Sequence, residues 1–197
     1  FKKSAFEVVS YGKKVAEKVG STLVVVAINA ADASELYTYG AEKVITVSNN
    51  SLSTFNAKGY AAVLSQVASK EAATVVVLDS SVDSMYLAPL LAVNLEAGYA
   101  SNVVDVPSSV SPFTVKRKAF SSKAFNHTEI TTPIKVIGVA KNSFGVHENA
   151  VSGSLESFDA QISESDLGVA SVSVEKASGT ITIADADTVV SAGRGLK

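Results

Sequence analysis

The sequence predicts an α/β protein with a Rossmann-like, doubly wound fold, in which a mainly parallel sheet carries helices on both faces. Helical and strand-like segments alternate through the first half of the chain, as βαβ units require. Two apolar runs rich in β-branched residues, Thr22–Ile28 and Ala73–Asp79, lack polar alternation and are typical of strands buried on both faces. After Gly98 the helical pattern stops, which predicts an antiparallel β addition in the second half.

The first half contains helices and strands of ordinary length, with glycine at two expected helix ends. In chain order we expect a helix around Val8–Val19 closed by Gly20, a strand at Thr22–Ile28, a small helix at Ala33–Tyr39, a strand at Lys43–Val47, a helix at Thr54–Ser69, a strand at Ala73–Asp79 and a helix at Met85–Leu95 closed by Gly98. The chain opens with a helix, whereas doubly wound sheets open with a central strand. We therefore expect a further strand upstream of Phe1.

The second half reads as short β segments separated by polar turns. The expected segments are Asn102–Val106, Pro112–Lys118, Ala119–Phe125, Thr131–Ala140, Ser154–Ala160 and Val169–Lys176, with a loop at Lys141–Ser154, a connector at Gly179–Asp185 and a terminal strand beginning at Asp187–Ser191. No helical periodicity lies between these β segments.

Composition excludes several classes of protein. The net charge of −2 argues against nucleic acid or an anionic membrane as a partner, since both select a basic surface. The absence of cysteine excludes a disulfide scaffold, a thiolate metal site and a catalytic thiol. Apolar runs are far shorter than the roughly 20 residues of a membrane span, so we expect no membrane insertion. With no visible signal peptide, a cytoplasmic, bacterial location is our expectation.

The polar residues that could bind a ligand or a metal each have a simpler structural interpretation. His127 and His147 lie in separate polar loops with no third ligand at metal-site spacing, so no metal site is expected. Asp79 ends a buried strand, where α/β ligand sites gather, but its Asp-Ser-Ser run also predicts a cap for the next helix, and we prefer the cap. The triplet Lys116–Lys118 predicts a solvated edge strand with Arg117 on the face opposite its neighbours.

Motifs for nucleotide binding and for hydrolysis are missing. No P-loop, nucleophile elbow or H-E-x-x-H helix is present, and N-A-A-D-A-S-E, after the first apolar run, lacks the glycines that let a backbone approach a pyrophosphate. A hydrolase is therefore disfavoured. A stand-alone nucleotide-binding regulatory module remains the alternative function on architecture alone.

The terminal S-A-G-R-G has two interpretations. Glycines after a strand allow backbone to approach a flat or anionic group, and Arg194, between Gly193 and Gly195, offers a planar, permanently charged fork of donors. A flexible chain end is the equally supported alternative.

Three stretches together resemble the alpha subunit of the electron transfer flavoproteins. The stretches are F-K-K-S-A-F-E-V-V-S-Y-G with the strands up to Val47, L-A-P-L-L-A-V-N-L-E-A-G-Y-A-S-N-V-V-D-V at Leu87–Val106, and A-D-A-D-T-V-V-S-A-G-R-G-L-K at Ala184–Lys197. The last stretch resembles the family's junction, usually S-G-G-R-G-L-K, where its flavin domain starts. Two departures are Ala192 in place of a glycine, and Lys116–Phe125 where the family tends to carry Arg followed by Tyr-Ala-Gly.

The resemblance implies an electron carrier rather than an enzyme. Residues 1–183 would be the amino-terminal scaffold domain, which binds no nucleotide and packs on a beta subunit as a heterodimer, and 184–197 would start the FAD-binding domain. Electrons would pass on FAD from a flavin dehydrogenase to an acceptor. Gly193, Arg194 and Gly195 would contact FAD in the intact protein. We expect residues 1–197 alone to lack FAD, and the apolar tail at Val189 and Val190 to pair with a neighbour or stay disordered.

Overall fold

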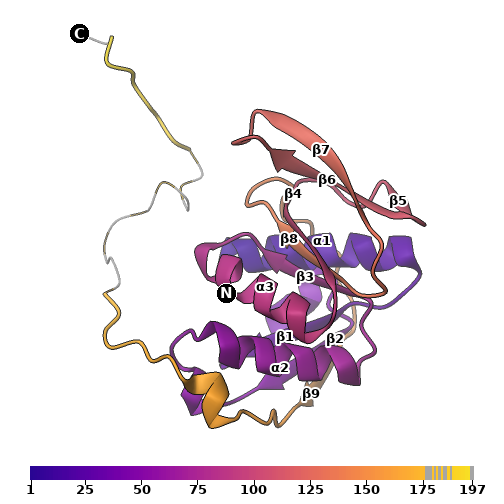
Figure 1. Cartoon of the computed structure of the whole chain (residues 1–197), viewed down its shortest axis with the longest axis vertical. Coiled ribbons are helices and arrows are strands. Elements are labelled where there is room, and N and C mark those ends of the chain that lie inside the picture. Colours follow the sequence, from indigo (N-terminus) through magenta and orange to yellow (C-terminus); the bar gives the residue numbers. More distant parts are fainter. Residues whose placement is uncertain (176–178, 180, 182, 184–185, 187, 196–197) are drawn as a thin grey trace.

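A computed structural model describes residues 1–175, 179, 181, 183, 186 and 188–195 (Figure 1). The long helices and the strands are α1 (Lys3–Val19), β1 (Val24–Ile28), β2 (Lys43–Val47), α2 (Ala57–Lys70), β3 (Val75–Asp79), α3 (Val82–Asn94), β4 (Gly98–Val103), β5 (Ser109–Val110), β6 (Phe113–Ala119), β7 (Ala124–Ile130), β8 (Lys135–Val139) and β9 (Ser154–Ser157). Short 3₁₀ turns are η1 (Ser34–Tyr39), η2 (Asn50–Leu52) and η3 (Glu164–Leu167).

The strands form two sheets that share the same helical layers. In the described residues, β1, β2 and β9 make a parallel sheet in the order β1-β2-β9. The second sheet has the order β3-β8-β4-β6-β5, with β7 on β6; β3, β8 and β4 are parallel, whereas β6 is antiparallel to its neighbours. The predicted α/β class, with helices on both faces and an antiparallel addition in the second half, is confirmed.

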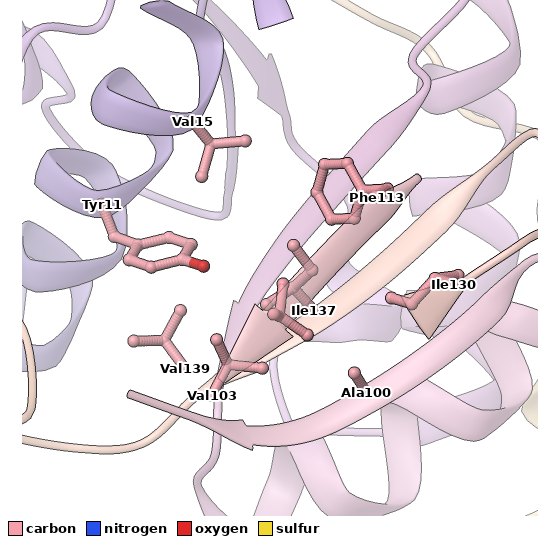
Figure 2. Close-up of a cluster of buried hydrophobic side chains, with 9 residues drawn as sticks. Tyr11, Val15, Ala100, Val103, Phe113, Ile130, Ile137 and Val139 are labelled. Atoms are coloured by element: carbon pink, nitrogen blue, oxygen red, sulfur yellow. The ribbon is translucent and has the colours of Figure 1, made fainter. Parts of the chain in front are cut away.

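Helix α1 covers one face of both sheets. Its Val9 packs on Ala27 of β1 and Val44 of β2, while Tyr11 and Val15 pack on the second sheet. Figure 2 shows Tyr11 and Val15 projecting from α1 towards the strands that carry Val103, Ile137 and Val139. One apolar stripe on a single helix therefore joins the two sheets.

Helices α2 and α3 cover the opposite face. Val63 of α2 packs with Val26 and Ile28 of β1, while Leu91 of α3 packs with Val76 and Leu78 of β3. Because successive side chains of a strand point to opposite faces, neighbouring valines of β1 and β3 reach different helices. This explains why both strands lack polar alternation in sequence.

The helix ends follow the expected chemistry in two places. Gly20 closes α1 with a φ of 71°, a left-handed conformation that suits glycine. Ser81 caps α3, because its side chain accepts a hydrogen bond from the backbone N–H of Ser84. Gly98, predicted to close α3, instead begins β4, since the helix already ends at Asn94.

Strand β9 is attached through a cluster of ion pairs. Lys43 on β2 lies 2.8 Å from Glu156 of β9 and 2.8 Å from Glu71, and Lys70 also pairs with Glu156. The hydrogen bonds from Lys43 and then Lys70 lower the pKa of Glu156 to about 2. Its carboxylate therefore stays charged at neutral pH and joins β9 to β2 and α2.

Several expectations about the second half are corrected. Ala119–Phe125 is not one β segment: β6 ends at Ala119, residues 120–123 form a turn, and β7 starts at Ala124. The triplet at Lys116–Lys118 does not lie on an edge strand, because β6 pairs with β4 and β7 on its two sides. His127 lies in β7 opposite Lys116 rather than in a loop. Residues 124–127 of β7 are all exposed, so most of this strand has no buried face that alternation in the sequence could reveal.

Other predicted elements are shifted or absent. The small helix at Ala33–Tyr39 is a 3₁₀ turn, and the strand predicted at Asn102–Val106 starts earlier, at Gly98. Residues 169–175 form no strand; Lys176, the last residue of that predicted segment, lies outside the described residues. For the terminal strand, Asp187 is likewise outside them, and residues 188–191 form no strand. Most of the predicted connector at Gly179–Asp185 is also outside them.

No helix within the part of the chain that the structure describes has the length and apolar character needed to span a membrane.

Candidate functional site

The carboxyl ends of the parallel strands carry a capped carboxylate. Asp79 at the end of β3 accepts hydrogen bonds from the hydroxyls of Ser84 at 2.5 Å and Ser81 at 2.7 Å. Burial raises the pKa of Asp79, but the donors Ser84 and Ser81 outweigh it, so the net pKa is lowered. The charged carboxylate of Asp79 thus has hydrogen-bond donors in Ser81 and Ser84, and it stabilises the first turn of α3. The cap expected in the Asp-Ser-Ser run is confirmed, with Ser81 as the capping residue and Asp79 as the acceptor that holds its hydroxyl.

The turn after β1 is already occupied by an acidic side chain. Asp32 accepts hydrogen bonds from the backbone N–H of Ser34 at 2.8 Å and from its hydroxyl at 3.0 Å. After β1 the left-handed position, with a φ of 52°, is taken by Asn29 rather than by a glycine, so a side chain lies where a dinucleotide-binding loop has open backbone. A phosphate placed here would meet the Asp32 carboxylate, so the turn lacks the features of a dinucleotide-binding loop.

A second polar group lies at the same edge of the sheet. Arg117 reaches from β6 to the hydroxyl of Ser101, with Nη2 and Oγ 3.0 Å apart. Its Nε is buried and has no hydrogen-bond partner among the described residues. The hydroxyl of Tyr99 lies close by, and burial raises its pKa while the positive charge of Arg117 opposes that rise. Sequence reasoning missed this pairing, because β4 and β6 meet only in the folded sheet.

The histidines do not meet. His127 is exposed on β7, whereas His147 lies in the loop after β8 with its Nε2 3.0 Å from the carbonyl oxygen of Phe144. The described residues contain no group of three or more histidine, aspartate or glutamate side chains that could hold a metal ion.

Arg194 is exposed to solvent. A Cβ added at Gly193 or Gly195 would meet no atom within 4 Å. A flavin needs walls on several sides. The described residues do not supply such walls around Arg194, so they do not by themselves fit the cofactor that the resemblance implies.

Helix α3 carries an exposed apolar stripe. Val82, Met85, Tyr86 and Val93 are 69%, 65%, 67% and 75% exposed, and they recur at i, i+3, i+4 and i+11 on one face together with exposed Pro89. The opposite face buries Leu87, Ala88, Leu91 and Ala92 in the core. Because the core covers only one of the two apolar faces of α3, the exposed face is available to bind another protein surface. Met85 and Val93 belong to the apolar residues from which this helix was predicted, and the structure places both on its exposed face.

A family model for the electron transfer flavoprotein domain matches residues 1–164, which is most of the described fold. The chain belongs to the electron transfer flavoprotein family. The match ends at Glu164, where η3 begins, so it covers the two sheets and their helices.

Two curated relatives are both named electron transfer flavoprotein subunit alpha. The protein from Bacillus subtilis is 30% identical over 167 residues, covering 84% of this chain and 51% of the relative. The protein from Thermoanaerobacterium thermosaccharolyticum is 28% identical over 202 residues, covering 98% of this chain and 61% of the relative. The chain therefore spans about half to three-fifths of the length of these electron transfer flavoprotein relatives.

Proposed function

We propose that the chain is the scaffold part of the alpha subunit of an electron transfer flavoprotein, a carrier that moves electrons on FAD from a flavin dehydrogenase to an acceptor. The observation that carries this proposal is the family match over residues 1–164. In this proposal residues 1–183 form the scaffold domain and 184–197 begin the FAD-binding domain. The complete protein would work as a heterodimer with a beta subunit in the bacterial cytoplasm.

The capped edge of the sheet supports a scaffold role for this domain. Asp79 and Asp32 are both engaged in local hydrogen bonds, and each places a carboxylate at a turn where a phosphate would have to approach. The exposed stripe of α3 supports a partner surface, since contiguous apolar patches on helices mark interaction sites. We assign the beta subunit to that stripe.

Charge placed on the α3 stripe is expected to weaken the heterodimer. Met85→Asp or Val93→Asp would bury a carboxylate without a partner in the interface, so we expect the Kd for the beta subunit to rise at least tenfold. The melting temperature of the isolated chain should stay unchanged, because both side chains are exposed. Titration calorimetry with the beta subunit gives the Kd. Val172→Asp, at a side chain that is 100% exposed outside the helices, is the matched control, and equal affinity of all variants would contradict the assignment.

Arg194 is proposed to contact the flavin in the complete heterodimer. Its fixed positive charge favours negatively charged reduced forms of the cofactor, so Arg194→Ala should lower the reduction potential by some tens of millivolts, where about 59 mV is a tenfold change per electron. Arg194→Lys keeps the charge and should retain most of the potential while losing planar contacts. Flavin content and spectroelectrochemical titration provide the measurements. If the Arg194→Ala protein keeps the flavin content and the reduction potential of the wild type, Arg194 is not a flavin-binding residue.

A further inference from the structure

The β6–β7 hairpin concentrates positive charge in a chain that is acidic overall. Residues 113–130 contain four of the 17 lysine and arginine residues of the chain and one of its 19 acidic residues, Glu129. The hairpin therefore has a net charge of +3, whereas the rest of the chain has −5 and the whole chain −2. Such a local excess creates a positive potential over this part of the surface, which attracts a negatively charged partner to it.

One face of the hairpin is basic and aromatic. Val115 of β6 is fully buried in the core of the second sheet, so Lys116 on one side of it points to the opposite face, because side chains alternate along a strand. Lys118, two residues further on, shares that face. His127 lies directly opposite Lys116 and Phe125 directly opposite Lys118, which places all four on one face. Phe125 is 58% exposed and His127 is exposed, so this face is open to solvent.

The turn that joins β6 to β7 adds a second exposed ring. Phe120 is 79% exposed, and Figure 1 shows the hairpin at the outer rim of the folded body. Its φ of 49°, and the φ values of 50° and 64° at Ser121 and Ser122, lie in the left-handed region, which is unfavourable for a bulky side chain above all. An exposed ring on an unfavourable backbone does not stabilise the fold. Contact with another molecule would give the ring of Phe120 a role.

The lysines of the hairpin are not used in ion pairs within the described residues. Several lysines of the folded body pair with glutamates, whereas Lys116, Lys118 and Lys123 pair with no described carboxylate. The Nζ of Lys116 instead lies 4.5 Å from the ring centroid of Phe125, and the Nζ of Lys123 lies 5.8 Å from that of Phe120. Each exposed ring thus has a cation beside it, so one partner surface can meet both.

We propose that the exposed lysines and rings of this hairpin dock the acidic face of a protein partner. The hairpin surface consists of Lys116, Lys118, Phe120, Lys123, Phe125 and His127. The two rings fill the apolar centre of the contact, and the lysines pair with carboxylates at its rim. A nucleic acid or an anionic bilayer is a wide anionic surface that would also face the acidic remainder of the chain, so both are disfavoured. The proposal depends neither on the electron-carrier function nor on the beta-subunit contact assigned to α3.

The test uses a short acidic peptide as the probe and reads individual amides of the whole chain by NMR. Acetyl-Asp-Glu-Trp-Glu-Asp-amide supplies carboxylates around one aromatic ring, and acetyl-Asn-Gln-Trp-Gln-Asn-amide has the same shape without the charges. We expect saturable shifts confined to residues 113–130 with the acidic peptide, and binding of the neutral peptide at least about fivefold weaker. Salt at about 1 M, where the screening length is about 3 Å, should remove this difference.

Variants separate the contribution of the charges from that of the rings. Lys118→Glu should raise the Kd of the acidic peptide about fivefold, because it replaces an attraction by a repulsion. Lys58→Glu, at an exposed position of α2, makes the same change in net charge and should leave that Kd unchanged. Phe120→Gly should also weaken binding about fivefold. Its melting temperature should stay the same or rise, since glycine suits the positive φ at this position.

Equal binding of the acidic and neutral peptides, or no binding of either, would overturn the proposal. So would an equal loss of affinity in Lys58→Glu and Lys118→Glu, because the effect would then be one of net charge alone. Vesicles of phosphatidylserine and phosphatidylcholine and a short DNA duplex are tested in parallel. Tighter binding of either than of the acidic peptide, lost in Lys118→Glu, would assign the hairpin surface to a membrane or to nucleic acid and overturn the proposed protein partner.

Discussion

Glu7→Ala is expected to lower the free energy of unfolding by about 3–5 kcal/mol. The Glu7 side chain is only 3% exposed, and its carboxylate accepts backbone N–H bonds from Asn142 at 2.8 Å and from Phe144 and Gly145 at 2.9 Å each. Removing it leaves three donors without their acceptor, and each buried unsatisfied donor costs about 1–3 kcal/mol. Urea unfolding followed by circular dichroism gives the difference.

Two further variants separate charge from packing at this position. Glu7→Gln retains one acceptor oxygen for Phe144 and Gly145 but places an amide nitrogen against the N–H of Asn142, so an intermediate loss is expected. Glu17→Ala is the control on the same helix, because Glu17 is an exposed partner of Lys14 and should change stability by less than about 1 kcal/mol. A loss below about 1 kcal/mol for Glu7→Ala would contradict the assigned role of its carboxylate.

Tyr11→Ala is expected to cost about 3–5 kcal/mol, the usual range for removing a fully buried aromatic side chain. The ring of Tyr11 is fully buried between α1 and the second sheet (Figure 2). It meets Phe144 edge-on, with ring centroids 5.3 Å apart. Its hydroxyl donates to the carbonyl oxygen of Asp105 at 3.0 Å. Tyr11→Phe keeps the ring and should cost about 1 kcal/mol, which isolates the hydrogen bond.

The same residue gives the chain a specific response to alkaline pH. Burial, and secondly the negative charge of Asp105, raise the pKa of the Tyr11 hydroxyl above its ordinary value of 10.0. A raised folded-state pKa means that the unfolded chain ionises first, so this contribution to stability is complete below about pH 10 and falls as the pH rises further. Urea midpoints from about pH 8 to 11 should therefore decline less in Tyr11→Phe than in the wild type. An identical decline in both proteins would contradict this prediction.

The candidate site was only partly predictable from sequence. The cap in the Asp-Ser-Ser run could be predicted because Ser81 and its partners Asp79 and Ser84 lie within a few residues of one another. The Arg117–Ser101 pair joins β4 and β6 and has no local signature. The exposed apolar face of α3 could be partly predicted, because its sequence has apolar residues on two faces of the helix and the core can bury only one. The sequence does not say which of the two faces is exposed.

The sequence by itself determined the α/β class, the parallel pairing of its first half and the positions of α1, α2 and α3 to within a few residues. These features depend on local periodicity and on caps such as Gly20 and Ser81, which act within a turn or two of helix. Only the tertiary structure decided which strands are neighbours, and it places the strands of the described residues in two sheets, one ending at β1 and the other at β3. Strand neighbours are chosen by hydrogen bonds between residues far apart in the chain, and no short-range pattern encodes them.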